Sequence, residues 1–363
     1  MVKQNQYFPQ VVFHPGETLL EKLEEMGMGP KEFALRTGKP EKTVSAVLKG
    51  ESSITPDMAV LFENVTKIPA RFWLNSQRGY DEYLARIKQQ EVIEKAVVWA
   101  KNFPLTQMVK FGWLNATSSK QEMAAQLLAF FGLASHQSWE NYYYKQQLKV
   151  AFRISLAYTK EPYAISAWLR KGELSAQQIQ AQPYSEKIFK EKLAEIKSVM
   201  AEQPDDFFHQ IRTICLKAGV KVVHTPSLPK APISGATRWI NNTPVIQLTG
   251  RGKRNDKFWF SFFHEAGHIL LHGKKEIFLE QIEYKDKDLQ KEKEADEFAV
   301  KWTFSHEDEA KLKEKLPDTE EAFFQYARTI NTHPAIIIGR LQHNKEIPYS
   351  LGQKFFKTID LSN

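Results

Sequence analysis

Residues 260–272 read FSFFHEAGHILLH and place two histidines four residues apart in an otherwise apolar run. Four residues are about one helical turn, so His264 and His268 would project from the same face of a helix. Neutral imidazoles at this spacing can bind one metal ion, and Glu265 can take a proton from water on that metal. The pattern predicts a buried helix with a zinc site suited to amide hydrolysis. The alternative is a pair of core histidines satisfied by the backbone.

A zinc ion that keeps one position open for catalysis needs a third protein ligand. The stretch EKEADEFA at residues 292–299 begins 24 residues after His268. Its helical spacing predicts Glu292 as the third ligand and Asp296, one turn later, as the acceptor of an imidazole N–H. Glu294 remains open as the ligand, because a helical pattern alone does not fix which face points inward. His272, one turn beyond His268, is a further candidate to contact metal or substrate.

The composition indicates a folded, modular protein of 363 residues, 42% of them hydrophobic. No run approaches the roughly 20 apolar residues that cross a bilayer, and MVKQNQYFPQ lacks the features of a signal peptide. The one cysteine, Cys215, excludes an internal disulfide and a cysteine-based zinc site. We therefore expect a cytoplasmic protein with no membrane partner.

The net charge of +7 suggests a nucleic-acid partner, but its distribution matters more than its total. Residues 1–84 hold ten Lys and Arg against eleven Asp and Glu. A DNA-binding role of the N-terminal region must therefore rest on local clustering of charge.

Residues 8–87 have the pattern of a small all-α domain of five short helices. Within it, PKEFALRTGKPEKTVSAVLKG at residues 30–50 predicts a helix, a tight turn at Gly38 and a second helix. Val44, Val47 and Leu48 give the second helix an inward face. The residues left outward can contact phosphates and base edges of double-stranded DNA, and they are Lys42, Thr43, Ser45, Ala46 and Lys49.

The rest of the chain divides into a helical connecting region, residues 88–215, and an α+β domain, residues 216–348. In the latter, VKVVHTP and PVIQLTG have the β-branched pattern of short strands between helices. We expect the second to be an edge strand on which an extended peptide substrate could add. The predicted architecture is thus multidomain: an all-α N-terminal domain, a helical middle and an α+β C-terminal domain.

Residues 230–345 resemble the ImmA/IrrE family of zinc metallopeptidase domains. The resemblance is carried, in order, by ISGATRW, TPVIQL, FFHEAGHILLH, the ExxADxFA pattern and HPAIIIGRLQH. It implies a zincin-like fold that binds Zn²⁺ through His264, His268 and Glu292, with Glu265 as the general base.

Residues 8–86 resemble the HigA-type antitoxin branch of the Cro/C1 helix-turn-helix family. FWLNSQRGYDEYLAR is the most specific piece of this resemblance, which implies that residues 41–49 form the DNA recognition helix. Helix-turn-helix proteins often bind palindromic sites as dimers, so a homodimer is a candidate assembly.

Two functions are consistent with these patterns. The first is a DNA-binding transcriptional regulator whose zinc endopeptidase domain hydrolyses a protein partner such as a repressor. The second is an antitoxin-type protein that binds DNA and neutralises a cognate toxin, with the peptidase fold as a non-catalytic sensor or scaffold. For the first, the candidates to stabilise a tetrahedral oxyanion are Arg238, Tyr284 and His333.

Overall fold

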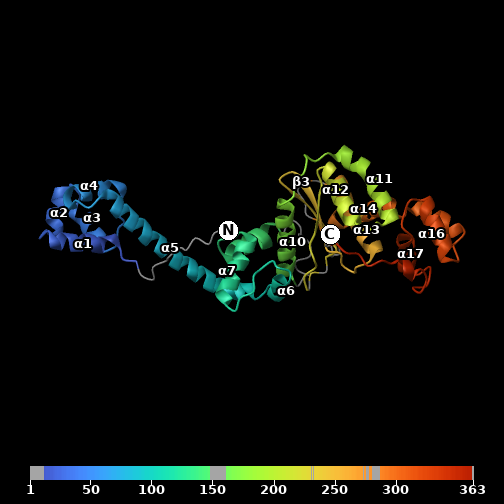
Figure 1. Ribbon diagram of the computed structural model, residues 1–363, viewed down its shortest axis with the longest axis horizontal. Helices are drawn as coiled ribbons and strands as arrows, with labels where there is room; N and C mark the ends of the chain where they lie inside the picture. The colour runs from blue at the N-terminus through green and yellow to red at the C-terminus, as the bar shows by residue number, and fades with distance from the viewer. Residues whose placement is uncertain are drawn as a thin grey trace. The chain divides into compact units, whose positions relative to one another are not determined.

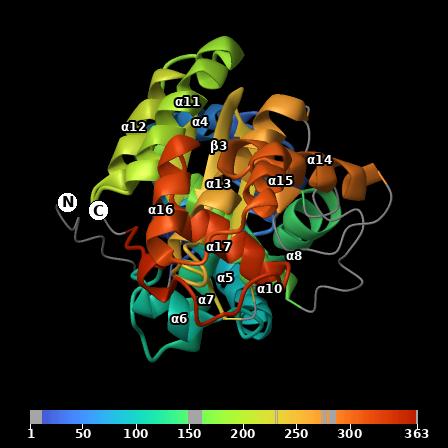
Figure 2. The same ribbon diagram turned by 90° about the vertical axis from the view of Figure 1, so that its right-hand side faces the viewer.

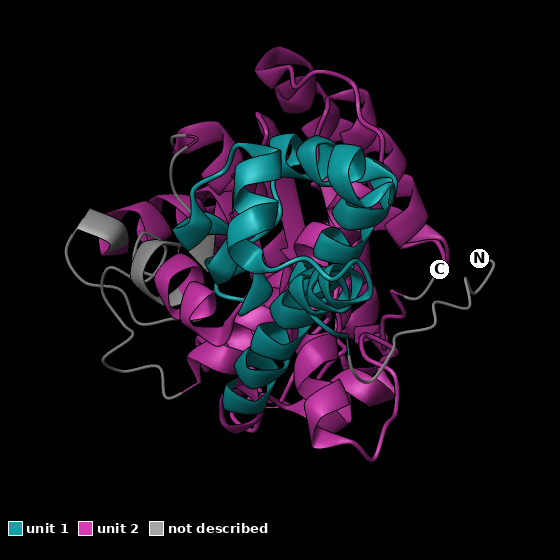
Figure 3. Ribbon diagram, turned by 90° about the vertical axis from the view of Figure 1, so that its left-hand side faces the viewer, with its two compact units in different colours: residues 1–95 teal, residues 96–363 magenta. Residues whose placement is uncertain are grey.

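The computed structural model describes residues 12–147, 161–229, 231, 233–272, 274, 278–279 and 287–361. The chain forms two compact units, Met1–Lys95 and Ala96–Asn363 (Figure 3). Among the described residues, none of the helices combines the length and the hydropathy that a bilayer-spanning segment requires.

The first unit is all-α, as its sequence predicts (Figure 1). Its helices are α1 (Pro15–Glu25), α2 (Pro30–Thr37), α3 (Glu41–Leu48), α4 (Pro56–Thr66) and α5 (Ala70–Ala100), of which the last five residues belong to the second unit. Proline at the first position starts α1, α2 and α4, where its missing N–H costs nothing. Their apolar faces meet in one core that includes Leu19, Phe33, Val44, Phe62 and Trp73.

Helix α5 continues past residue 87, where we expected the first domain to end, and reaches Ala100. Residues 81–100 contain neither glycine nor proline, so nothing in the local sequence interrupts the helix.

The second unit combines helices with a small sheet. Before the sheet come α6 (Leu105–Lys110), α7 (Lys120–Phe131), α8 (His136–Trp139), η1 (Glu140–Gln147), α10 (Pro162–Gln177), α11 (Glu186–Glu202) and α12 (Phe207–Lys217). After its first three strands come α13 (Asn255–Leu271), α14 (Lys287–Thr303), α15 (His306–Glu314), α16 (Glu320–Thr329), α17 (Pro334–His343) and η2 (Gln353–Phe355). A helix was also expected over residues 148–157, which lie outside the described residues.

The sheet has the strand order β1-β3-β2-β4, with β1 (Lys221–His224), β2 (Gly235–Ile240), β3 (Thr243–Leu248) and β4 (Phe278–Leu279). Strand β3 pairs in parallel with β1 and antiparallel with β2, and β4 pairs antiparallel with β2. The predicted strands at β1 and β3 are confirmed. The prediction that β3 is an edge strand is wrong, because β1 and β2 flank it. Its nearly continuous burial is typical of an interior strand.

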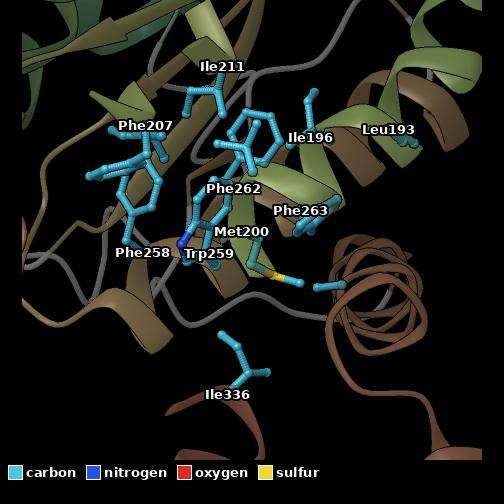
Figure 4. Packing of buried hydrophobic residues seen from close by; sticks show 14 of the residues in the cluster. Leu193, Ile196, Met200, Phe207, Ile211, Phe258, Trp259, Phe262, Phe263 and Ile336 are labelled. Carbon is cyan, nitrogen blue, oxygen red and sulfur yellow. The ribbon is translucent and has the colours of Figure 1, made fainter. Parts of the chain in front are cut away.

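One face of the sheet packs on α13 in the main core of this unit. Side chains of α11, α12, α13 and α17 gather there, among them Met200, Phe207, Trp259, Phe262 and Ile336 (Figure 4). Figure 2 shows α13 and β3 near the centre of the unit, with α12 on one side and α14 on the other. Cys215 is buried in the same core, and burial raises the pKa of its thiol, so it behaves as a small apolar residue.

The opposite face of the sheet is covered by α10, through polar contacts. Three side chains of the sheet donate hydrogen bonds to carbonyl oxygens of α10: Lys221 to Ala176 (2.9 Å), Arg238 to Leu169 (2.6 Å) and Gln247 to Trp168 (2.7 Å). In return, Trp168 Nε1 donates to the carbonyl oxygen of Thr225 at 3.0 Å. Helix α10, which lies in the predicted connecting region, therefore packs directly against the sheet.

The C-terminal segment fixes the start of α13. The side chain of Asn255, the first residue of the helix, donates to the Phe355 carbonyl oxygen at 3.1 Å and accepts from the Lys357 N–H at 3.2 Å. Ile359 N–H donates to the Lys253 carbonyl oxygen just before the helix. Because Asn255 is buried, these bonds replace water at the helix start.

We predict that Arg238→Met lowers the free energy of unfolding of the second unit by about 2 kcal/mol, because it removes a charged hydrogen bond from a buried carbonyl. Chemical denaturation monitored by circular dichroism measures this. Lys187→Met, at an exposed position, is the control and should change the free energy by less than about 0.5 kcal/mol. Equal stability of the two variants would show that the contact of Arg238 with α10 is not needed.

Candidate metal centre and nucleic-acid interface

Helix α13 brings the two histidines of the HEAGH motif onto one buried face. His264 is 2% and His268 is 1% exposed, and their ring centroids lie 4.7 Å apart. The helix is buried on almost every side because the sheet, α14 and α17 all pack against it. Buried polar side chains require hydrogen-bonding or metal partners, so these two histidines mark α13 as a candidate functional element.

Helix α14 supplies a carboxylate to both imidazoles. Glu292 Oε2 lies 3.3 Å from His264 Nε2, and Glu292 Oε1 lies 3.4 Å from His268 Nε2. The two Nε2 atoms are 3.0 Å apart. These three residues form a group of metal-ligating type within the described part of the chain.

The spacing of these atoms fits a zinc ion. Ligand atoms at Zn–N and Zn–O distances of about 2.0–2.1 Å in a tetrahedron lie about 3.3–3.4 Å from one another. The two Nε2 atoms are 3.0 Å apart, and each has a different oxygen of the Glu292 carboxylate near that distance, Oε2 at 3.3 Å for His264 and Oε1 at 3.4 Å for His268. Two imidazoles and one carboxylate also form the protein ligand set of catalytic zinc sites that leave one position open. The residues present therefore fit the metal that the motif predicts.

The electrostatics of the site favour the ligand form of histidine. Burial, together with the neighbouring imidazoles of His264 and His272, lowers the pKa of His268 well below its ordinary value. His268 is therefore neutral at physiological pH, and a neutral imidazole has the lone pair that a metal requires.

Glu265 lies one residue along from the first histidine and is fully buried. Its carboxylate lies against Gly235 at the start of β2, where a Cβ atom would come within 2.6 Å of Oε1. Thr237 of the same strand donates a hydrogen bond from Oγ1 to the Glu265 carbonyl oxygen at 2.9 Å. Strand β2 thus sets the position of Glu265, and only glycine at position 235 leaves room for its carboxylate.

Asp296 and His272 lie on the Nδ1 side of the two imidazoles, away from their Nε2 atoms. Asp296 Oδ1 is 2.8 Å from His264 Nδ1. His272 Nδ1 is 2.9 Å from His268 Nδ1, and His272 Nε2 is 3.1 Å from Glu294 Oε2. Hydrogen bonds from Gln290 and then from His272 lower the pKa of Glu294. The sequence left Glu292 and Glu294 open as the third ligand. The Glu292 carboxylate lies near both Nε2 atoms, whereas the Glu294 carboxylate contacts His272.

Of the three oxyanion candidates, the two that lie among the described residues, Arg238 and His333, are not brought to this site. Arg238 points its guanidinium at α10, on the sheet face opposite α13. His333 lies at the start of α17, where its Nδ1 accepts the Ala335 N–H at 3.2 Å. Tyr284 lies outside the described residues.

A cleft of about 670 Å³ opens beside the metal centre. Phe260 and Ser261, one turn before the first histidine of α13, form part of its wall. Asp296, the partner of His264, forms another part, and Arg340 and Tyr349 come from the C-terminal region. The cleft therefore meets the metal centre at Asp296, on the Nδ1 side of His264, and is not lined by His264, His268 or Glu292 themselves.

In the first unit, α2 and α3 form the predicted helix, turn and helix. Gly38 ends α2 with a φ of +66°, a backbone conformation that glycine adopts without strain. Val44 and Val47 of α3 are buried. The five candidate DNA-contacting residues lie at exposed positions (Lys42, Lys49) or half-buried ones (Thr43, Ser45, Ala46). Their contact with DNA stays a prediction.

Helix α5 packs against the other helices of this domain through three of its side chains. Trp73 is fully buried in the core, and Gln77 Oε1 accepts the Ile54 N–H at 2.9 Å. Tyr80 packs edge-on against His14, the residue that caps α1, with ring centroids 4.9 Å apart. The most specific piece of the N-terminal resemblance therefore has a structural role.

Comparisons with known proteins match one region in the C-terminal part of the chain and one helix-turn-helix region. The IrrE N-terminal-like domain, Peptidase_M78, matches residues 215–333. The uncharacterized HTH-type transcriptional regulator YddM of Escherichia coli (strain K12) is 32% identical over 66 residues, 18% of this chain and 70% of that protein. This chain belongs to the HTH-type transcriptional regulators. It joins a helix-turn-helix domain to a C-terminal IrrE-like domain, which confirms the resemblance inferred from the motifs.

Two solved structures are similar to part of this regulator. The HigA-family addiction module antidote protein of Coxiella burnetii is 37% identical, with 23% of this chain and 91% of that chain covered and a TM-score of 0.22. The Pseudomonas aeruginosa antitoxin HigA, solved with the higBA promoter, is 29% identical, with 23% and 94% covered and a TM-score of 0.23.

The regulator's IrrE-like domain should lose stability as pH falls, and His333 should be one cause. Burial lowers the pKa of His333 to about 4, and its Nδ1 accepts hydrogen bonds that protonation would break. Between about pH 6.5 and 4 the unfolded chain binds a proton that the folded chain does not. Stability therefore falls with pH in this window, by up to about 3 kcal/mol from this group.

The variant His333→Asn keeps a side-chain acceptor at the helix start without the titrating ring. We expect the free energy of unfolding of this variant to fall less steeply between pH 7 and pH 4.5 than that of the wild type, in denaturant titrations at several pH values. Parallel curves for the two proteins would exclude His333 as a source of the pH dependence.

Proposed function

We propose that this regulator binds double-stranded DNA through α3 and that its IrrE-like domain is a zinc-dependent endopeptidase acting on a protein partner such as a repressor. The observation that carries the proposal is the triangle of His264 Nε2, His268 Nε2 and the Glu292 carboxylate, in a domain that matches a peptidase family. A zincin-like fold for this domain is part of the proposal.

Bound at this triangle, zinc would supply Lewis acidity and lower the pKa of a coordinated water to about 7. Glu265, held by β2 beside the histidines, accepts the proton of the attacking water and then donates it to the leaving amine. Asp296 fixes the orientation of His264 by accepting its Nδ1 hydrogen. The cleft along α13 borders the site at Asp296, on the Nδ1 side of His264.

DNA binding by this regulator would rest on α3 and not on the overall charge of its domain. Lys42, in the first turn of α3, and Lys49, which caps its C-terminal end, are exposed, and the half-buried Thr43, Ser45 and Ala46 lie between them in the sequence. Two lysines can contact phosphates on either side of the groove that the helix enters. These five residues include no arginine, asparagine or glutamine, the usual residues for bidentate base recognition, so sequence preference would be modest.

The first test of the peptidase proposal is the metal content. We expect about one zinc ion per chain in protein purified without chelator, and loss of that zinc in His268→Ala and Glu292→Gln, measured by elemental analysis. Glu297→Gln, at an exposed position of the same helix, is the matched control and should still contain zinc. Wild-type protein without zinc after reconstitution would exclude a metallopeptidase.

The matched catalytic variant is Glu265→Gln, which should keep its zinc and lose cleavage. Mapping of new N-termini in cells that express either protein identifies the substrate as the protein cut only by the wild type. Identical maps from the two strains, with zinc present in both proteins, would favour the antitoxin-type function with a non-catalytic domain.

For the DNA-binding unit, we expect Lys42→Ala and Lys49→Ala each to weaken binding to duplexes selected from a random pool. Each should also reduce the slope of log affinity against log salt by about 0.9, the value for one lost phosphate contact. Fluorescence anisotropy over a salt series measures both quantities. Lys22→Ala on α1, where the lysine pairs with Glu25, is the control; an equal effect there would contradict the assignment of α3.

A further inference from the structure

A second chain of hydrogen-bonding groups leads away from the metal centre at His268. His272 follows the last residue of α13 in extended backbone conformation, and its side chain is 3% exposed. Its Nδ1 lies 2.9 Å from His268 Nδ1 and its Nε2 lies 3.1 Å from Glu294 Oε2. The Glu294 side chain is 46% exposed, so this chain of groups runs from the buried centre to the surface.

We infer that His272 and Glu294 are positioning residues that hold His268 in its metal-binding tautomer. The inference rests on the proposed zinc site. If His268 binds metal through Nε2, its proton is on Nδ1, which must then donate to Nδ1 of His272. His272 in turn has its proton on Nε2 and donates to the Glu294 carboxylate. This placement of the protons gives a donor and an acceptor to both contacts, the one between His268 and His272 and the one between His272 and Glu294. In this tautomer His268 Nε2 carries no hydrogen and can bind metal.

The two histidine ligands are supported in different ways. His264 donates directly to the carboxylate of Asp296, whereas His268 donates to a neutral imidazole that is polarised by a carboxylate. A carboxylate partner fixes a ring and raises its basicity more than a neutral one does. His272 contacts His268 directly, and Glu294 acts on His268 only through His272.

The arrangement also explains why two glutamates of α14 reach the same site. Residues two apart on a helix leave it in different directions, so Glu292 and Glu294 cannot both face α13. Glu292 faces His264 and His268, while Glu294 meets His272 beyond the end of α13. Both carboxylates thus have distinct functions at one centre.

The test is the zinc affinity of the full-length protein, measured by competition with a chromophoric chelator. We expect His272→Leu to weaken zinc binding 10- to 100-fold, the range typical of lost partners of metal ligands. His272→Asn, whose side-chain oxygen can accept the His268 hydrogen, should stay within about 3-fold of wild type. His306→Leu, at an exposed histidine of α15, is the control and should bind zinc as the wild type does.

Glu294→Gln separates the relay from a simple structural role. We expect it to weaken zinc binding a few-fold in the wild-type background and to have no effect when combined with His272→Leu, whose side chain can neither accept nor donate a hydrogen bond. The visible absorption spectrum of the cobalt-substituted protein should shift in His272→Leu and not in His306→Leu. Thermal melting of the metal-free variants checks that each one folds.

Zinc affinity of His272→Leu equal to that of the wild type would overturn the inference and leave the proposed function intact. An equal effect of Glu294→Gln with and without His272→Leu would overturn the relay through His272. If His272→Leu does not fold, the surface variant Glu294→Gln still decides, because no change in its affinity would also overturn the inference. Wild-type protein that binds no zinc would instead overturn the proposed function on which this inference rests.

Discussion

The structure of the IrrE-like domain depends on the contact of α13 with α14, where buried imidazoles meet carboxylates. His264 and His268 are almost inaccessible to solvent, and a buried polar group without a partner costs several kcal/mol. Glu292 and Asp296, one turn apart on α14, are placed to meet them. The register between the two helices follows from this requirement, because a shift of one residue along α14 would turn both carboxylates away from the imidazoles.

Strand β2 links this contact to the rest of the unit. One side of the strand presents Gly235 and Thr237 to Glu265 on α13, while the other side directs Arg238 at α10. Alternation of side chains along a strand makes this possible over four residues. The position of Glu265 is therefore set by a strand that is itself held from behind by a helix far earlier in the chain.

The sequence predicts well those features that arise from local periodicity. The five N-terminal helices, the helix with both histidines and the spacing from Glu292 to Asp296 follow from turns, caps and one-turn intervals. The choice between Glu292 and Glu294 did not follow, because it depends on the rotation of α14 against α13. Strand β2 and the two-residue β4 were missed as strands, and β3 was misplaced at the edge, because strand order is set by non-local pairing. Arg238 was a candidate to stabilise an oxyanion, but it donates to the carbonyl oxygen of Leu169, 69 residues earlier, which local patterns do not indicate.

The packing of α10 on the sheet has an evolutionary consequence. The recognisable family domain begins at residue 215, yet α10 ends at Gln177 and accepts hydrogen bonds from two buried side chains and one partly buried side chain of that domain. A gene fusion that joined a new N-terminal module at residue 215 would leave these side chains without their acceptors. Viable recombination points lie before Pro162, so α10 is expected to be inherited with the peptidase-like sheet whenever such domains are exchanged between regulators.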